Sequence, residues 1–263
     1  MSKILSLSLS IGLLAVASAV SAQDGSIIAQ DRADGQEVNN GTNPTLLTTQ
    51  AVVQFQYNEI NSNLDSDLLE FQYMTPIGDG TKALKFTLPF ANSPFDNDLD
   101  IGDISITFFD VFYLTKQNGA AYTAELFFDT ASRDDNGYGQ FALETSVYYA
   151  FFLKNGGIFA PAWVQTFGLE GGNDNGEKLN QTTIDFYYVP KLKNPKYFMT
   201  YDPAIIHDWE NDETFGSLQV TLGMLTGKAF GGDSQVFVKP GILFGGDAPA
   251  DWSIQVGYKV LNF

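Results

Sequence analysis

The chain of 263 residues contains no cysteine, a single histidine, and only 14 basic residues against 31 acidic ones. The absence of cysteine excludes a disulfide-stapled scaffold, a thiolate metal site and a lipid anchor on an N-terminal cysteine. One histidine, His207, does not suffice for a histidine-based metal site. A formal net charge of −17 excludes nucleic acid binding through phosphate contacts, because the phosphates are repelled.

Long apolar runs are absent except at the N-terminus. Lys3 precedes an apolar stretch over residues 4–20, and Ser21 and Ala22 then precede Gln23. This arrangement predicts a signal peptide at residues 1–22 and favours it over a retained membrane helix. Later segments lack the roughly 18 apolar residues of a spanning helix, so a membrane-embedded body requires a closed β-barrel, in which every backbone amide is satisfied.

Aromatic residues and glycine are plentiful, with 22 Phe, 12 Tyr and 25 Gly, and this composition is typical of β structure. From Ala51 onward, apolar residues occupy alternate positions, as in Val53, Phe55 and Tyr57. One face of each segment is therefore apolar, whereas the other is mixed or polar. This alternation is expected of strands that show one face to lipid and the other to a lumen.

The alternation predicts an all-β fold, a single antiparallel transmembrane β-barrel of about 12 strands over residues 51–263. An even number returns both chain ends to the periplasm, as single-chain bacterial barrels require. The expected strands cover residues 51–60, 67–76, 82–90, 101–115, 119–130, 138–154, 157–169, 181–192, 196–209, 214–227, 234–245 and 251–263.

The connections between these strands fall into two classes. Those after odd-numbered strands are long or acidic, as at 91–100 and 170–178, whereas those after even-numbered strands are mostly tight turns with lysines beside them, as at 78–80 and 154–157. Short periplasmic turns and longer outer loops are typical of bacterial outer-membrane barrels. The sequence therefore predicts this location, with acidic extracellular loops; a soluble β-sandwich, the alternative, gives no reason for such segregation.

Aromatic residues also fall near the ends of the expected strands, where interfacial belts form. The alternative assigns them to the core of a soluble sandwich. These residues are Trp163, Trp209, Trp252, Tyr57, Tyr138 and Tyr258.

Residues 23–50 are polar and show no apolar period. We expect a flexible periplasmic leader or a plug inside the lumen, and the composition favours the disordered leader.

The candidate site consists of polar residues on the inward face of the expected strands. A lysine facing lipid near the midplane costs about 2–4 kcal/mol, so the lumen is the favourable place for these charges. Acids outnumber lysines, so an open lumen is expected to favour cations or neutral solutes; a lumen filled by salt-bridged side chains is the alternative. The lumen-lining candidates are Glu70, Lys85, Asp103, Glu125, Asp129, Glu144, Asp185, Asp202 and Lys239, together with Gln219, Gln235 and Lys259.

An enzymatic alternative depends on His207, which an outer-membrane lipid hydrolase would pair with a serine nucleophile. Ser217 and Ser146 are the formal candidates, but we expect His207 to be an interfacial or loop-bracing residue. We therefore predict no enzyme, and we assign no catalytic residue, metal or cofactor. The loop from Asp96 resembles a calcium loop but has Ile101 in place of the required glycine.

Two residues do not fit the alternation. Asp110 shares the parity of apolar residues on its strand, and the terminal Phe263 is out of phase with Trp252 and Tyr258. A β-bulge in each strand would restore both to phase.

Five short phrases recur in the order of a known family over residues 100–263. They are Ile101-Gly-Asp-Ile-Ser, Ala160-Pro-Ala-Trp163, Tyr201-Asp-Pro-Ala-Ile-Ile-His-Asp-Trp209, Gly223-Met-Leu-Thr-Gly-Lys-Ala-Phe230 and Pro249-Ala-Asp-Trp-Ser-Ile-Gln255. This order resembles the outer-membrane transporters grouped with the meta-pathway phenol-degradation proteins. The resemblance implies a single barrel that passes small, often aromatic or apolar, organic molecules, and none of the phrases is a catalytic signature. The expected function is thus a channel or transporter for passive passage of a small organic molecule or cation, with the lipid bilayer, the outer-membrane assembly machinery and the solute as partners.

Overall fold

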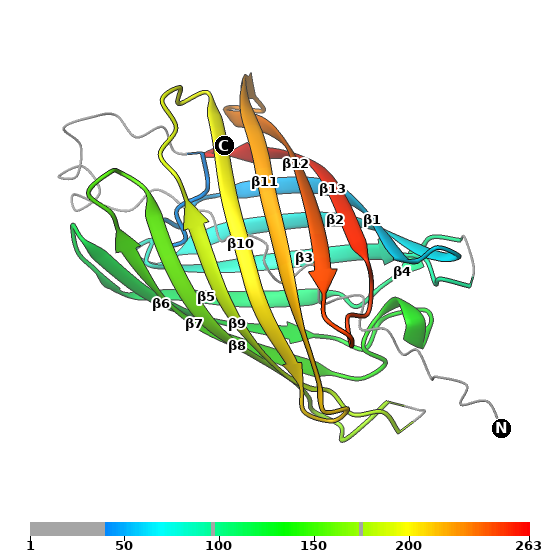
Figure 1. Ribbon diagram of the computed structural model, residues 1–263. Coiled ribbons are helices and arrows are strands. Elements are labelled where there is room, and N and C mark those ends of the chain that lie inside the picture. Colours follow the sequence, from blue (N-terminus) through cyan, green and yellow to red (C-terminus); the bar gives the residue numbers. More distant parts are fainter. Residues whose placement is uncertain (1–39, 96–97, 174–175) are drawn as a thin grey trace.

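The computed structural model describes residues 40–95, 98–173 and 176–263, and these form one antiparallel sheet that closes on itself (Figure 1). The first strand, β1, pairs with both β2 and the last strand, β13, which closes the barrel. The expected signal peptide and residues 23–39 of the expected leader lie outside the described residues. The strands are β1 (Gln50–Asn61), β2 (Leu64–Ile77), β3 (Lys82–Ala91), β4 (Asp100–Ile101), β5 (Ser105–Leu114), β6 (Asn118–Phe127), β7 (Ala142–Phe152), β8 (Ile158–Gly168), β9 (Asn180–Val189), β10 (Tyr197–Asp208), β11 (Glu213–Ala229), β12 (Gly232–Phe244) and β13 (Trp252–Leu261).

The predicted all-β barrel is confirmed, with twelve long strands and the two-residue strand β4. Ten expected strands agree with the observed ones to within three residues at each end, and two differ by more. The segment 101–115 is interrupted, because residues 102–104 leave the sheet between β4 and β5, and the expected strand 138–154 begins only at Ala142. Both differences lie where Asp103 binds the connection that follows β6, as described below.

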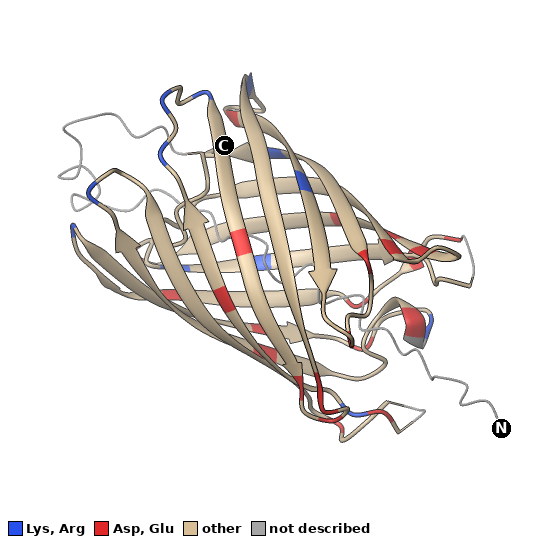
Figure 2. Cartoon of the chain, in the orientation of Figure 1, with Lys and Arg blue, Asp and Glu red and all other residues tan. Residues whose placement is uncertain are grey.

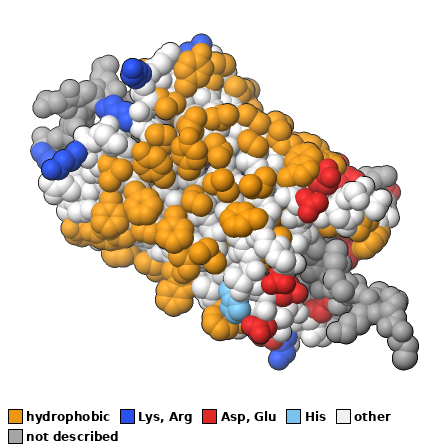
Figure 3. Space-filling view, in the orientation of Figure 1, with side chains coloured by type: hydrophobic (Ala, Val, Ile, Leu, Met, Phe, Trp, Pro, Cys, Tyr) orange, Lys and Arg blue, Asp and Glu red, His pale blue; other side chains and the backbone are white. Residues whose placement is uncertain are grey.

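Burial along the strands alternates in the opposite sense to that of a soluble protein. In β1, Gln54, Gln56 and Asn58 are buried, whereas Val53 and Phe55 are exposed. Figure 3 shows an apolar band on one face of the barrel exterior. An exposed apolar exterior around a buried polar interior is stable in lipid, where alternating strands show their apolar residues outward. In the described part of the chain, no helix is long and apolar enough to cross a membrane.

The two ends of the barrel differ in loop length and charge. We call one the short-turn end, formed by residues 78–81, 115–117, 153–157, 190–196 and 230–231, and the opposite one the long-loop end. Lysines gather at the short-turn end and acidic residues at the long-loop end, as Figure 2 shows. The predicted segregation of loops and charges is therefore present in the structure. Among the described residues, the long-loop end consists of residues 62–63, 92–95, 98–99, 102–104, 128–141, 169–173, 176–179, 209–212 and 245–251.

Of the two residues that did not fit the alternation, Asp110 lies beside the expected irregularity in β5, which does not turn it inward, and Phe263 lies beyond the end of β13. Asp110 stays on the outward face opposite Lys82, and its Oδ2 lies 3.8 Å from the lysine Nζ; the register shift of β5 follows Asp110. Strand β13 ends at Leu261, and Asn262 has φ of +58°. This left-handed residue redirects the chain, and the Phe263 ring then lies 6.4 Å from that of Tyr73.

The aromatic positions agree only partly with the expected belts. Trp252 packs outward against Tyr57 at the long-loop end, with ring centroids 5.4 Å apart. The expectation for Tyr138 was wrong, because its side chain is only 8% exposed and packs edge-on against Phe127 inside the barrel.

A phenylalanine covers a glycine on the neighbouring strand at the inner wall. Phe237 of β12 is directly opposite Gly257 of β13, and a Cβ on Gly257 would lie 2.2 Å from the Phe237 Cζ. We expect Gly257→Val to force the ring away and to lower the free energy of unfolding by about 1–3 kcal/mol. Urea unfolding in lipid vesicles measures this change. Gly246→Val is the control, since a Cβ there meets open space; equal stability of both variants would contradict the close packing.

Candidate functional site: the barrel lumen

Residues 40–49 lie inside the short-turn end of the barrel. Leu47 is only 2% exposed and packs with Met74 and Phe109 in an apolar cluster. Two inward tyrosines hold the backbone of the segment. The Tyr148 hydroxyl donates to the Pro44 carbonyl at 2.5 Å, and the Tyr187 hydroxyl donates to the Thr42 carbonyl at 3.1 Å.

The segment is also joined to the C-terminus of the chain. The Thr48 hydroxyl is hydrogen-bonded to the Asn262 side chain, and the Asn262 N–H donates to the Thr49 carbonyl at 2.9 Å. Buried backbone carbonyls require such partners. Residues 40–49 are therefore fixed to three parts of the barrel wall, β7, β9 and the end of β13, so this part of the predicted leader is an ordered inner segment.

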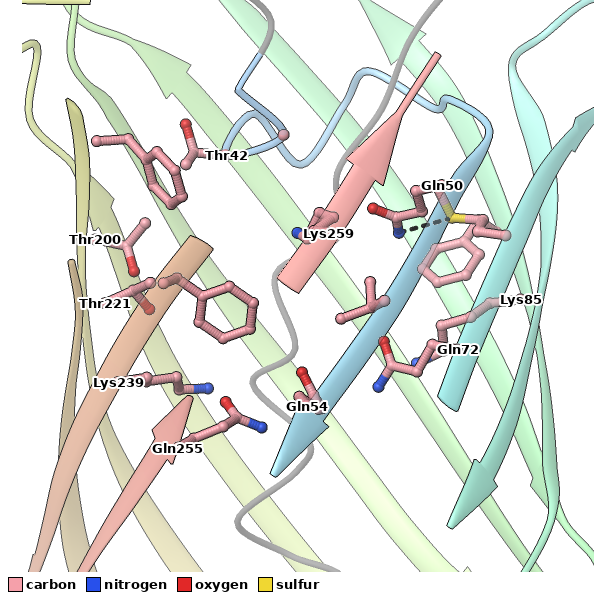
Figure 4. A pocket seen from close by; sticks show the side chains of 16 residues that line it. Thr42, Gln50, Gln54, Gln72, Lys85, Thr200, Thr221, Lys239, Gln255 and Lys259 are labelled. Atoms are coloured by element: carbon pink, nitrogen blue, oxygen red, sulfur yellow. Dashed lines mark hydrogen bonds between the residues drawn. The ribbon is translucent and has the colours of Figure 1, made fainter. Parts of the chain in front are cut away.

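A cavity next to this segment forms what we call the inner chamber (Figure 4). Its free space is about 50 Å³, room for a few water molecules. Side chains from β1, β2, β3, β5, β10, β11, β12 and β13 line it, and Gly41 and Thr42 form part of its wall. The polar and charged lining consists of Thr42, Gln50, Gln54, Gln72, Lys85, Thr200, Thr221, Lys239, Gln255 and Lys259.

A second cavity, the outer chamber, lies toward the long-loop end and has a free space of about 80 Å³. Gln72 and Lys85 line both chambers, so the two cavities adjoin. In contrast to the inner chamber, the outer chamber is rich in acids. Its charged lining consists of Glu70, Lys85, Asp103, Glu125 and Asp135.

An ion pair stands at the boundary between the chambers. The Lys85 Nζ lies 3.5 Å from the Glu125 Oε2, and each side chain is 12% exposed. The Ser105 hydroxyl donates to the other Glu125 oxygen at 2.5 Å. Glu144 is the cross-strand neighbour of Glu125 and accepts a hydrogen bond from Thr166 at 3.0 Å. The Lys85 ammonium group is therefore the positive charge next to two adjacent buried carboxylates, those of Glu125 and Glu144.

A second charged group lies on the other side of the lumen. Asp185 of β9 and Asp202 of β10 lie near each other on neighbouring strands, and both interact electrostatically with Lys239 of β12. Several inward polar atoms have no hydrogen-bond partner within the described residues, as a water-filled lumen would explain. Examples are Thr87 Oγ1, Thr107 Oγ1, Asp202 Oδ1 and Gln235 Oε1.

Most predicted lumen residues are thus brought together inside the barrel, but Asp129 and Asp103 differ from the others. Asp129 follows the end of β6 and is exposed at the long-loop end. Asp103 is 7% exposed and anchors the connection 128–141 by accepting hydrogen bonds from three backbone N–H groups. The donors are Thr130 at 3.1 Å, Ala131 at 3.0 Å and Tyr138 at 2.6 Å.

The Asp103 anchor is tight. Burial raises the pKa of the Asp103 carboxyl, and the backbone N–H donors offset part of that rise, so it takes up a proton at a higher pH than an exposed aspartate does. A Cβ on Gly137 would lie 2.3 Å from the Asp103 Oδ2. Only glycine therefore leaves room for the carboxylate at this point of the connection.

We expect Asp103→Ala to loosen the connection 128–141 and speed tryptic cleavage after Arg133 by at least about tenfold, because each orphaned buried donor costs about 1–3 kcal/mol. Gly137→Ala should have the same effect through the collision described above. Timed proteolysis of the folded protein measures the rate. Asp79→Ala, in an exposed turn at the opposite end, is the control; a rate unchanged by Asp103→Ala would refute the anchor.

His207 is on the outward face of β10 and contacts neither candidate serine. Its Nδ1 is hydrogen-bonded to the Thr214 hydroxyl at 2.8 Å, and its ring packs edge-on against Trp209 at 4.4 Å. Ser217 is buried on the inward face, and Ser146 is hydrogen-bonded to Thr123. The structure therefore does not assemble the hydrolase alternative. Among the described residues, no group of three His, Cys, Asp or Glu side chains is arranged to hold a metal ion.

The sequence matches no protein-family model and none of the curated proteins. Solved structures are similar in fold: the COG4313 outer membrane channel from Pseudomonas putida F1 superposes with a TM-score of 0.60 at 12% identity, over 81% of this chain and 95% of that one. The NanC porin gives 0.58 at 9% identity, over 82% and 100%, and the KdgM porin 0.56 at 8%, over 80% and 98%. The chain thus has the fold of outer-membrane channels and porins, and its apolar exterior is that of an outer-membrane protein.

Proposed function

We propose that the protein is a bacterial outer-membrane channel for the passive passage of a small solute. The observation that carries this proposal is the inverted burial of a closed barrel: an exposed apolar exterior surrounds a polar lumen that contains two adjoining chambers. The likeness in fold to porins and to a COG4313 channel supports it. The short-turn end then faces the periplasm, and the acidic long-loop end faces outward.

The route for the solute leads through the two chambers. The acids of the outer chamber, with Glu70 and Glu125 among them, would line the entrance, and the inner chamber would follow past Lys85. A solute can move along such a path by exchanging one set of hydrogen bonds and ionic contacts for the next at successive weak binding sites. Small organic molecules are the proposed solute class, as the resemblance to the phenol-degradation transporters implies.

Residues 40–49 form a plug at the periplasmic end of this route in our proposal. Their hydrogen bonds to Tyr148 and Tyr187 and the buried Leu47 support it. Passage requires that the plug shift away from the wall. These contacts are few compared with the strand pairings of the barrel, so the plug can move while the barrel stays folded.

Proteoliposome swelling tests the proposed function. We expect vesicles that contain the folded mature chain, from Gln23 on, to swell in an isotonic solution of a small neutral solute such as glycerol and not in one of a large oligosaccharide. His207→Ala is the matched variant for the enzymatic alternative, and we expect it to leave swelling unchanged because this side chain lies outside the lumen. Absence of swelling by a heat-modifiable, folded barrel would favour a structural barrel with an occluded lumen.

A further inference from the structure

The inner chamber differs in charge from the rest of the lumen. Three lysines line it, Lys85, Lys239 and Lys259, and none of the described residues in its lining is acidic. The acids of the outer chamber stop at the boundary formed by Lys85. The sequence prediction that acids dominate the lumen therefore describes the entrance, while the chamber nearest to the plug is basic.

The lysines converge on this chamber from different strands. Lys239 extends from β12 and Lys259 from β13, as Figure 4 shows, and both side chains line the chamber. Acidic neighbours of these lysines lie outside the lining: Glu125 pairs with Lys85, and Asp202, Asp185 and Glu70 act on Lys239. Holding like charges together in a buried site costs free energy, which an anion placed between them would offset.

Neutral donors complete the set. The side-chain amides of Gln54, Gln72 and Gln255 line the same chamber. The Gln54 amide donates one N–H to Glu70, and because an amide has two N–H donors, each of the three amides can offer one to a negative oxygen. Figure 4 shows Gln54 and Gln255 beside Lys239. Ammonium and amide N–H groups that converge from several sides are the arrangement that binds a carboxylate through charge-assisted hydrogen bonds.

The remaining wall is apolar. Phe109, Phe198 and Phe237, with Met74 and Val52, also line the chamber. Such a wall does not favour a bare inorganic ion, but it buries the hydrocarbon part of an organic molecule. The lining therefore combines a site for a negative head group with a surface for a short apolar body.

We propose that the inner chamber is a binding site for a small organic carboxylate, held by Lys239 and Lys259 through its carboxylate group and by Phe109, Phe198 and Phe237 through its apolar part. This inference rests on the proposed channel, whose solute class it names. The acids of the outer chamber repel a carboxylate, so Lys85 at the boundary and the lysines of the inner chamber supply the attraction that draws the solute inward and holds it next to the plug.

Calorimetric titration of the folded mature chain in detergent with butanoate and butanamide tests the site, because the two probes have similar size and differ in charge. We expect butanoate to bind at least about tenfold more tightly than butanamide. Lys239→Gln and Lys259→Gln should each weaken butanoate binding about tenfold, whereas Lys259→Arg, which keeps the charge, should retain it. Lys193→Gln, in an exposed turn at the short-turn end, is the matched control and should change nothing.

The outcomes separate this inference from the proposed function. Equal binding of the two probes, or butanoate binding that Lys239→Gln and Lys259→Gln leave unchanged in folded protein, would overturn the carboxylate site even if the barrel conducts. Butanoate binding to a barrel that lets no solute pass would support the site and overturn the channel. Loss of the heat-modifiable band would identify a variant that has failed to fold, and Lys259→Arg then supplies the folded comparison.

Discussion

Deletion of residues 40–49 is expected to raise the conductance of the barrel several-fold. These residues occupy the periplasmic end of the lumen, where Leu47 is buried among wall residues and Tyr148 and Tyr187 bind the backbone of the segment. Removing them leaves the strand pairings of the barrel intact, since β1 begins at Gln50. The narrowest part of the route should then widen, and the current through a pore rises with its cross-section.

A point substitution tests the same plug without shortening the chain. A Cβ on Gly119 would lie 2.7 Å from the Thr45 Cγ2, so Gly119→Leu should push the plug from the wall and raise the conductance in planar bilayers. Gly246→Leu is the control, because a Cβ there meets open space in the 245–251 loop. If both the deletion and Gly119→Leu conduct like the unchanged protein, residues 40–49 do not obstruct the route.

Lys85→Met is expected to lower the free energy of unfolding by about 3–5 kcal/mol, the usual cost of removing one partner from a buried ion pair. The variant leaves the Glu125 carboxylate without its lysine, beside Glu144 on the neighbouring strand. Two adjacent buried carboxylates repel each other, and one must take up a proton. The added substitution Glu125→Gln should restore much of the loss.

Urea unfolding in lipid vesicles measures both variants, and the outward pair Lys82 and Asp110 supplies the control. In that pair the Lys82 Nζ lies 3.8 Å from the Asp110 Oδ2, and the lysine side chain is 45% exposed. We therefore expect Lys82→Met to cost at most about 1 kcal/mol. Equal losses for Lys85→Met and Lys82→Met would show that the pair at the chamber boundary is not desolvated.

The sequence predicted the barrel well because the relevant signals are local. Alternation in a segment such as residues 51–60 reports which face is buried, and the tight turns at 78–80 and 154–157 report where strands reverse. The same parity placed Glu70, Glu144 and Asp202 on the inward face, and all three are buried in the structure. Parity failed where the chain leaves the sheet, as at Asp129 and Phe263.

The arrangement of the site could not be predicted in the same way. The parity of a residue in a strand shows which face of the sheet it is on. Its height along the barrel axis depends on strand tilt and register, which the sequence does not show. The separation of the basic residues Lys239 and Lys259 from the acidic Glu125 therefore became visible only in the structure. The plug binds through the backbone carbonyls of Thr42 and Pro44. Every residue has a backbone carbonyl, so the residue types in this segment do not show which carbonyls are bound. The partners Tyr148 and Tyr187 read as ordinary strand aromatics.

The central claim is that this barrel is a channel, and single-channel recording in planar bilayers tests it most directly. The folded mature chain and the chain that also lacks residues 40–49 are compared in the same membrane. We predict discrete conductance steps from both, and larger steps from the chain without the plug. No steps from either chain, when heat-modifiability shows that both are folded, would contradict the account.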